Sequence, residues 1–231
     1  LVQQQFYDFL QENISFSKNI QTYDRISDQD RIDFLFSIGG DGTLLRAVTY
    51  VRESNIPILG INTGRLGFIS SISTDQIDDA VDHVLNGDYK IRSRTLLELE
   101  TENNLFGTTN FALNEVAIVK KDTSSMIRID AFIDDEFLNS YWADGLLIST
   151  PTGSTGYSLS CGGPIILPGT KNVIIAPIAP HNLNVRPIII NEKSKIRLKV
   201  EDRDQLALVS LDSRSRAFDS SLELIIKKAD F

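Results

Sequence analysis

The stretch Gly39-Gly40-Asp41-Gly42-Thr43 (GGDGT) decides the fold of the first part of this sequence. The apolar run before it predicts a buried strand over residues 32–38, and apolar residues recur at helical spacing after it, over 43–53. Glycines let a ligand approach the backbone closely, and the N-terminus of a helix favours negative charge. We therefore expect phosphate oxygens to bind at this strand-to-helix junction.

Asp41 is unexpected in such a junction, because a carboxylate repels the phosphate that the backbone attracts. One interpretation is that Asp41 caps the helix, as aspartate commonly does. The other is that it accepts a hydroxyl proton during phosphoryl transfer, since a hydroxyl is a poor nucleophile until its proton has an acceptor. Its position alone leaves both interpretations open.

The sequence around GGDGT alternates strands and helices up to about Gly87. Residues 56–61 predict a second strand, the loop 62–70 (NTGRLGFIS) follows, and Ser73 and Gln76 form a capping-box pattern before the next helix. This order predicts a right-handed parallel unit, in which ligands bind beyond the carboxyl ends of the strands. A helix is predicted at 3–11, and we expect a further strand to precede it, because a parallel sheet usually opens with a strand.

Beyond Tyr89 the hydrophobic period changes from helical to two, and turn signals separate short segments. The exception is a helical segment at 153–161. The fold class expected is thus α/β followed by all-β, with an α/β domain over residues 1–90 and a β-rich domain over 91–231.

Composition excludes several classes of protein. With 231 residues, 42% of them hydrophobic and 23% charged, the chain is ordinary for one or two globular domains. A net charge of −8 argues against a general nucleic-acid binder, and no apolar run approaches the roughly 20 residues of a membrane span. The single cysteine, Cys161, fits a reducing compartment. We therefore expect a cytoplasmic protein without nucleic-acid or membrane partners.

Two polar segments stand out in the β-rich part. Residues 111–119 predict one apolar strand, which Asn114 and Glu115 interrupt. This polar pair lies either at an edge that faces water or supplies amide and carboxylate groups that bind sugar hydroxyls. Residues 150–160 hold six serine and threonine side chains between apolar strands. They form either a solvated linker or, as we favour, a loop that surrounds a purine.

Common alternatives are not supported by the motifs. The sequence has no GxxxxGK[ST] loop, no GxGxxG opening a helix, no GxSxG elbow and no cysteine–histidine set suited to zinc.

Five blocks in this order resemble the NAD kinases, and in particular their bacterial branch. They are GGDGT (39–43), NTGRLGF (62–68), LNE (113–115), DGLLISTPTGSTGYSLSCGGP (144–164) and PHNLNVRPI (180–188). GGDGT alone is weak, because diacylglycerol and sphingosine kinases and phosphofructokinases carry similar strings, whereas all five blocks together are highly specific.

The resemblance implies a Rossmann-like N-terminal α/β domain and a β-rich, sandwich-like C-terminal domain, with NAD bound between them. It implies transfer of the terminal phosphoryl group of ATP to the 2′-hydroxyl of the adenosine ribose of NAD, giving NADP. Mg²⁺ or another divalent cation is implied, and so is a homodimer or homotetramer in which a neighbouring subunit completes the site.

The resemblance also assigns residues, with Asp41 as the base. The positions that it implies for NAD are Asp41, Gly42, Phe68, Asn114, Glu115, Asp144, Thr155, Tyr157, Ser160 and Ala179. The positions expected at phosphates are Gly39, Gly40, Gly42, Thr43 and Arg65, the last inferred from charge and place. Asp144 and Ala179 are expected to reach the dinucleotide across the subunit interface.

The chain departs from the family pattern at two places. Gly156 stands where alanine is usual, and the usual LDGQ-like turn reads LDSR at 211–214, so that no role is assigned to Asp212.

Two other functions are considered beside the kinase of NAD. A lipid kinase that shares GGDGT needs an apolar or membrane-facing surface, and no amphipathic basic helix is present. A non-catalytic NAD or NADP sensor has no need of a base, yet Asp41 is retained.

Overall fold

The computed structural model describes residues 32–64, 67–70, 72–121, 126–182, 184–202 and 206–231. The chain divides into two compact units, Leu1–Ile91 and Arg92–Phe231. The first is α/β and the second is β-rich, which confirms the expected fold class. The expected limits of the domains, 1–90 and 91–231, stay a prediction, and the helix predicted at 3–11 lies outside the described residues.

A small parallel sheet forms the centre of the first unit. Its strands are β1 (Leu35–Ile38), β2 (Ile58–Asn62) and β3 (Ile72–Ser73), in the order β1-β2-β3. Strands β1 and β2 are both shorter than the apolar runs that predict them. Strand β2 begins after Pro57, which has no N–H to donate to a ladder.

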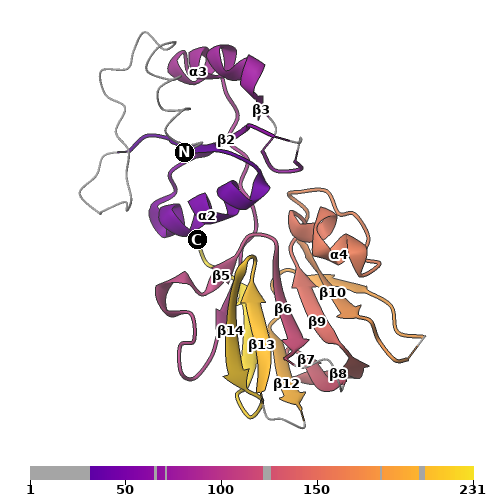
Figure 1. Ribbon diagram of the computed structural model, residues 1–231. Coiled ribbons are helices and arrows are strands. Elements are labelled where there is room, and N and C mark those ends of the chain that lie inside the picture. The colour runs from indigo at the N-terminus through magenta and orange to yellow at the C-terminus, as the bar shows by residue number, and fades with distance from the viewer. Residues whose placement is uncertain (1–31, 65–66, 71, 122–125, 183, 203–205) are drawn as a thin grey trace. The chain divides into compact units, whose positions relative to one another are not determined.

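Helices cover both faces of this sheet (Figure 1). Helix α2 (Asp41–Val51) continues into the 3₁₀ turn η2 (Arg52–Ser54), and the 3₁₀ turn η3 (Thr74–Gln76) leads into α3 (Ile77–Leu85). A side chain at Gly60 would collide with Leu44 of α2, whereas the next residue, Ile61, packs against α3. Because neighbouring residues of a strand point to opposite faces, α2 and α3 lie on opposite sides of β2.

The second unit is a sandwich of two antiparallel six-stranded sheets, counted over its described residues. One sheet has the order β5-β4-β15-β12-β7-β8 and the other the order β11-β10-β9-β6-β13-β14. The bounds of the strands are β4 Leu97–Glu100, β5 Phe111–Ala112, β6 Glu115–Lys120, β7 Ile127–Ile133, β8 Glu136–Ala143, β9 Gly145–Ser149, β10 Asn172–Ile178, β11 Ile188–Asn191, β12 Ile196–Glu201, β13 Leu206–Leu211, β14 Arg214–Asp219 and β15 Leu224–Lys228. Short helical turns are η4 (Gly107–Thr109), η5 (Gly153–Thr155) and α4 (Tyr157–Ser160).

The two sheets share one apolar core, as the period-two pattern predicts. On β12, for example, Ile196, Leu198 and Val200 are buried while Lys199 between them is exposed. Residues of both sheets, such as Leu198 and Ile148, belong to the same buried cluster. The alternation of apolar and polar residues is thus what turns two sheets toward each other.

A second, smaller apolar cluster covers the outer face of the sheet that contains β9. Ile166 packs there on Leu147 and Ile174, with Cys161 beside them. This packing fixes the segment that follows β9, including α4, beside β9 and β10 (Figure 1). The helical segment predicted at 153–161 is therefore confirmed and is anchored on the sheet. In the part of the chain that the structure describes, no helix is both long and apolar enough to cross a membrane.

Candidate active site

The carboxylate of Asp41 joins the start of α2 to the loop that follows β2. Its Oδ2 accepts the N–H of Phe68 at 2.9 Å, and its Oδ1 accepts those of Ile69 and Ser70 at 3.2 and 3.0 Å. The N-cap of α2 is Gly40, and no side chain caps this helix. The interpretation of Asp41 as a helix cap is therefore wrong.

The loop approaches Asp41 so closely that a side chain at Gly67 is excluded. A Cβ on Gly67 would lie 2.1 Å from Oδ1 of Asp41. Asn62 shapes the same loop, since its Oδ1 accepts the N–H of Gly64 at 2.8 Å. The NTGRLGF block is thus a turn built to fit one carboxylate.

Within GGDGT, some backbone N–H groups donate hydrogen bonds within the fold, and some glycines have open space beside them. The N–H of Gly39 donates to Ile61 O at 2.9 Å, and that of Thr43 donates to Gly40 O at 2.9 Å. Over the described residues, and apart from chain neighbours and the helix's own backbone, no atom lies within 4 Å of a Cβ placed on Gly40 or Gly42. The backbone donors of Gly39 and Thr43 are thus used by the fold, whereas the surroundings of Gly40 and Gly42 leave room for a ligand. Arg65 lies outside the described residues.

In the second unit, Asn114 and Glu115 lie where the chain passes from one sheet to the other. The predicted continuous strand over 111–119 is wrong, because β5 ends at Ala112 and pairs with β4, whereas β6 begins at Glu115 and pairs with β9. A strand that changes sheets must interrupt its ladder. The polar pair marks this interruption.

Glu115 is partly buried next to a second carboxylate. Burial, and after it the charge of Asp212, raises the pKa of Glu115 to about 7. Within the described residues, Oε2 of Glu115 and Oδ1 of Asn114 are buried without a hydrogen-bond partner. Two acceptors are thus available for hydroxyl donors of a ligand.

The hydroxyl-rich segment 150–160 is a built turn, and the linker interpretation is wrong. Oγ1 of Thr150 donates to Leu113 O at 2.6 Å, and Oγ of Ser154 donates to Pro151 O at 2.7 Å. A Cβ on Gly153 would lie 2.2 Å from Asn114 O. Several hydroxyls that were expected to surround a purine therefore satisfy the backbone instead.

Other side chains of this segment remain accessible. Tyr157 and Ser160 are exposed and Thr155 is partly exposed. Burial raises the pKa of the Tyr157 hydroxyl, and Cys161, Asp144 and Glu115 add to the effect, so these four groups form one cluster. Asp144 also pairs with Lys120, whose Nζ lies 2.6 Å from Oδ1.

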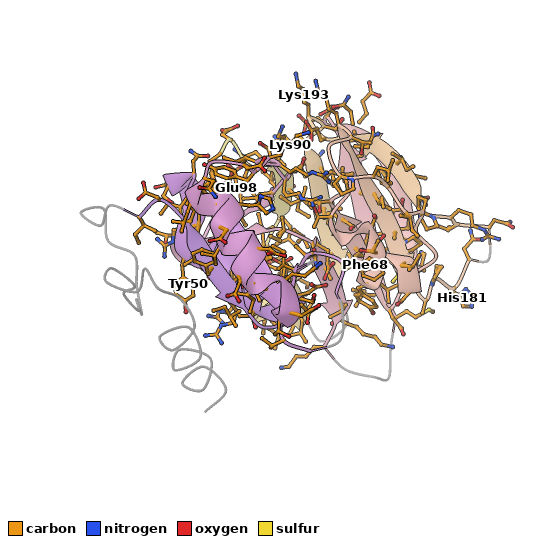
Figure 2. The ribbon with its side chains drawn as sticks, turned by 90° about the horizontal axis from the view of Figure 1, so that it is seen from above. Tyr50, Phe68, Lys90, Glu98, His181 and Lys193 are labelled. Atoms are coloured by element: carbon orange, nitrogen blue, oxygen red, sulfur yellow. The ribbon has the colours of Figure 1, made fainter. Side chains whose placement is uncertain are left out.

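Ala179 lies beside Asp144 at the end of β10. The N–H of Asp144 donates to Ile178 O at 3.0 Å, and Ala179 is exposed with a φ of 46°. The loop after it carries His181, which points away from the sheets (Figure 2). Phe68, labelled in the same view, is 73% exposed in the first unit.

The expected residues thus form two groups, each within its own unit. Asp41 with residues 67–70 makes the first group, and Asn114, Glu115, Asp144, Tyr157 and their neighbours make the second. Asp212 and Lys120 belong to the second group, and sequence reasoning missed both. Because LDSR replaces the usual LDGQ-like turn at 211–214, no role was assigned to Asp212. Its hydrogen-bond partners lie almost a hundred residues earlier in the chain.

No preformed metal site is present among the described residues. No group of three or more histidine, cysteine, aspartate or glutamate side chains is arranged to hold a metal ion there.

Fold and site together define a nucleotide-binding phosphotransferase class: an open helix N-terminus for phosphate with a carboxylate beside it, and a β-sandwich that offers acceptors and a tyrosine. Comparison with known families agrees. A model described as "ATP-NAD kinase N-terminal domain" matches residues 3–89, and one described as "ATP-NAD kinase C-terminal domain" matches residues 113–227.

Curated relatives carry the same name. The chain is 51% identical to the NAD kinase of Cytophaga hutchinsonii and 48% identical to that of Flavobacterium johnsoniae. Both alignments cover 100% of this chain and 80% of the relative. The chain belongs to the NAD kinase family.

Solved structures of the family have the same fold. An NAD kinase from Archaeoglobus fulgidus in complex with ATP is 27% identical, with a TM-score of 0.80 over 99% of this chain and 86% of its own. Yeast NADH kinase complexed with NADH is 31% identical, with a TM-score of 0.79 over 87% of this chain and 59% of its own.

Proposed function

We propose that this chain transfers the terminal phosphoryl group of ATP to the 2′-hydroxyl of the adenosine ribose of NAD, with Asp41 as the base. Membership of the NAD kinase family supports the activity. One observation supports the role of Asp41 as the base. Its carboxylate is held in place at a helix N-terminus, and the two neighbouring glycines, Gly40 and Gly42, have open space beside them.

In the proposed step the ribose oxygen forms a bond to the terminal phosphorus of ATP, and the bond from that phosphorus to the bridging oxygen breaks, releasing ADP. The hydroxyl proton passes to Asp41. A carboxylate has about four lone-pair sites, and among the described residues one amide, that of Phe68, donates to Oδ2 of Asp41. Oδ2 therefore keeps a site for the proton, while Oδ1, which accepts two amides, holds the group in place.

The terminal phosphates of the donor approach the N–H groups of Gly40 and Gly42 in this proposal. Neither glycine is required by the described part of the fold, since a Cβ would meet open space at both. A close approach of phosphate is a physical reason for glycine at such positions. Gly39, by contrast, has a φ of +146° and donates to Ile61, so the fold itself explains this glycine.

The second group of residues binds the nucleoside part of NAD. Asn114 and Glu115 supply acceptors for ribose hydroxyls, and Tyr157 offers an aromatic face to the adenine. Thr155, Ser160, Asp144 and Ala179 keep the roles that the family resemblance implies. Phe68 and Gly42 are assigned to the nicotinamide side.

Mg²⁺ or another divalent cation stays an expectation from the resemblance. The described residues contain no group of three or more histidine, cysteine, aspartate or glutamate side chains arranged to hold a metal ion, and the proposed step assigns no role to a cation. The homodimer or homotetramer and the cytoplasmic location also stay predictions.

The test is an assay of NADP formation from NAD with and without ATP, combined with calorimetric binding of NAD. A kinase forms NADP only with ATP. A sensor binds NAD without forming NADP, and a lipid kinase does neither, so each outcome selects one function.

A further inference from the structure

Asp212 holds the point where the chain crosses between the two sheets of the sandwich. It lies in the turn between β13 and β14, with a φ of 53°. Its Oδ1 accepts the N–H groups of Asn114 and Glu115 at 2.8 and 3.2 Å, and its Oδ2 accepts that of Leu113 at 3.0 Å. Its own N–H donates to Glu115 O at 3.0 Å.

These bonds replace the ladder that the crossing lacks. Since β5 ends at Ala112 and β6 begins at Glu115, residues 113 and 114 belong to neither ladder, and the pairing of β6 with β13 begins only at Val116. The carbonyls of the crossing are bound separately, because Thr150 donates its Oγ1–H to Leu113 O and its N–H to Asn114 O. One carboxylate therefore satisfies a set of amides that would otherwise be buried unpaired.

Arg214 extends the same clamp along the chain. Its guanidinium donates to the carbonyls of Thr109 and Phe111, just before the crossing. Its positive charge acts on Asp212 in opposition to burial, which raises the pKa of that carboxyl. The turn between β13 and β14 thus binds the chain on both sides of Ala112, through Arg214 before it and Asp212 after it.

We propose that Asp212 is a positioning residue for NAD, which holds the 113–115 crossing so that Asn114 and Glu115 present their side chains to the ribose. The proposal rests on the function proposed above only in assigning that pair to the ribose. Asp212 itself need not touch NAD, because it acts through the backbone of the pair and through its charge beside Glu115.

The charge of Asp212 gives the proposal a specific signature in pH. Burial and Asp212 together raise the pKa of Glu115 to about 7, so the ionised acceptor is lost as pH falls through that value. The other titratable groups that interact with Glu115 are Tyr157 and Cys161, and Asp144 nearby is neutralised by Lys120. Removing the charge of Asp212 lowers the pKa of Glu115 and moves the acid limb of NAD binding to lower pH.

The experiment compares the full-length protein with Asp212→Asn and with the matched surface change Asp219→Asn. Within the described residues, the carboxylate of Asp219 accepts hydrogen bonds from the N–H and the hydroxyl of Ser221, and Asp219 is exposed. The quantities are kcat and KM for NAD and for ATP from pH 5.5 to 9. For Asp212→Asn we expect KM for NAD to rise by about tenfold or more, the scale of a lost charge-assisted hydrogen bond. We expect kcat and KM for ATP to change little and the acid limb to move down.

An unchanged KM for NAD and an unmoved acid limb in Asp212→Asn overturn the proposal. So does a loss of kcat in proportion to the unfolded fraction with no change in pH profile, since this is what a merely structural residue gives. If the variant does not fold, the unmodified protein still decides. Its affinity for NAD, measured by calorimetry, must decrease as the pH is lowered through about 7. An affinity that does not change between pH 5.5 and 8.5 overturns the proposal.

Failure of the proposed function is recognised separately. If the unmodified protein forms no NADP, or if Asn114→Ala leaves KM for NAD unchanged, the assignment of the ribose site is wrong. If Asn114→Ala raises this KM but Asp212→Asn does not, only the positioning role of Asp212 is wrong.

Discussion

At the scale of single residues, the structure removes one of the two meanings that GGDGT allowed for Asp41. The carboxylate does not cap α2 but receives the amides of Phe68, Ile69 and Ser70. A group held by three donors is fixed in direction, and a base is most effective when its direction is fixed. The loop therefore orients the proposed base.

This dependence predicts different effects for alanine at Gly67 and at Gly64. A Cβ at Gly67 would lie 2.1 Å from Asp41, whereas one at Gly64 has no neighbour closer than 4.0 Å. We expect Gly67→Ala to break the bonds to Asp41, so that the amides of residues 68–70 exchange at least about tenfold faster, a loss of roughly 1.4 kcal/mol in protection. Hydrogen exchange measures this, with Gly64→Ala as the control. Equal exchange in the two variants would contradict the tight fit.

A second prediction concerns stability and pH at Glu115. The folded protein raises the pKa of this carboxyl from 4.5 to about 7. Folding therefore favours the protonated form, and the protein loses stability as pH rises from about 4.5 to 7. Glu115→Gln has no charge to bury. Its free energy of unfolding should exceed that of the unmodified protein by on the order of 1–3 kcal/mol at pH 8, and the advantage should shrink toward pH 5.

Urea unfolding at several pH values checks this, with the exposed Glu136→Gln as the control. The prediction is contradicted if the free energies of unfolding of Glu115→Gln and the unmodified protein differ by the same amount at all pH values. In that case folding does not raise the pKa of Glu115.

Sequence predicted some of these residues and not others, for physical reasons. Asn114 and Glu115 stood out because polar side chains interrupt an apolar run. Asp212 gave no such signal, since an aspartate in a turn is ordinary and its partners are distant in sequence. The raised pKa of Glu115 depends on burial, which no local pattern expresses.

At the scale of elements, hydrophobic period predicted the helices and the strands but not their membership of sheets. The run over 111–119 is uniformly apolar around its polar pair, so nothing in its pattern indicates that β5 and β6 join different sheets. The starts of β1 and β2 were also predicted too early, at 32 and 56 instead of Leu35 and Ile58. Apolar character begins before the first paired residues of the ladder, Leu35 and Ile58, whereas a strand begins only where it meets its partner.

The turn after β9 offers a comparison between two neighbouring glycines. A Cβ at Gly153 would lie 2.2 Å from Asn114 O, whereas one at Gly156 would be 3.3 Å from Gly153 O. We expect Gly153→Ala to push the turn off the sheet crossing and to destabilise the protein by roughly 3 kcal/mol or more. Gly156→Ala should change stability by less than about 1 kcal/mol. Urea midpoints decide, and similar midpoints for both variants would refute the close packing of the turn on Asn114.

At the scale of the whole molecule, the second unit holds an apolar core of its own. Its cluster runs from Leu97 in β4 to Ile226 in β15 and takes in both sheets. We therefore predict that residues 92–231, expressed alone, fold with a cooperative urea transition and a dispersed amide NMR spectrum. A collapsed spectrum without a transition would mean that the unit is not a domain. The fold class followed from the change of period near residue 90, which is a global feature of the sequence.

The central claim, phosphoryl transfer from ATP to NAD with Asp41 as base, is tested most directly by the rate of NADP formation in the unmodified protein and in Asp41→Asn. The account predicts ATP-dependent formation of NADP in the first. In the second it predicts a loss of turnover of about 10²–10⁴-fold, the usual contribution of a general base, with the calorimetric affinity for NAD little changed. An unmodified protein that forms no NADP would contradict the activity, and near-normal turnover in Asp41→Asn would contradict the role of Asp41.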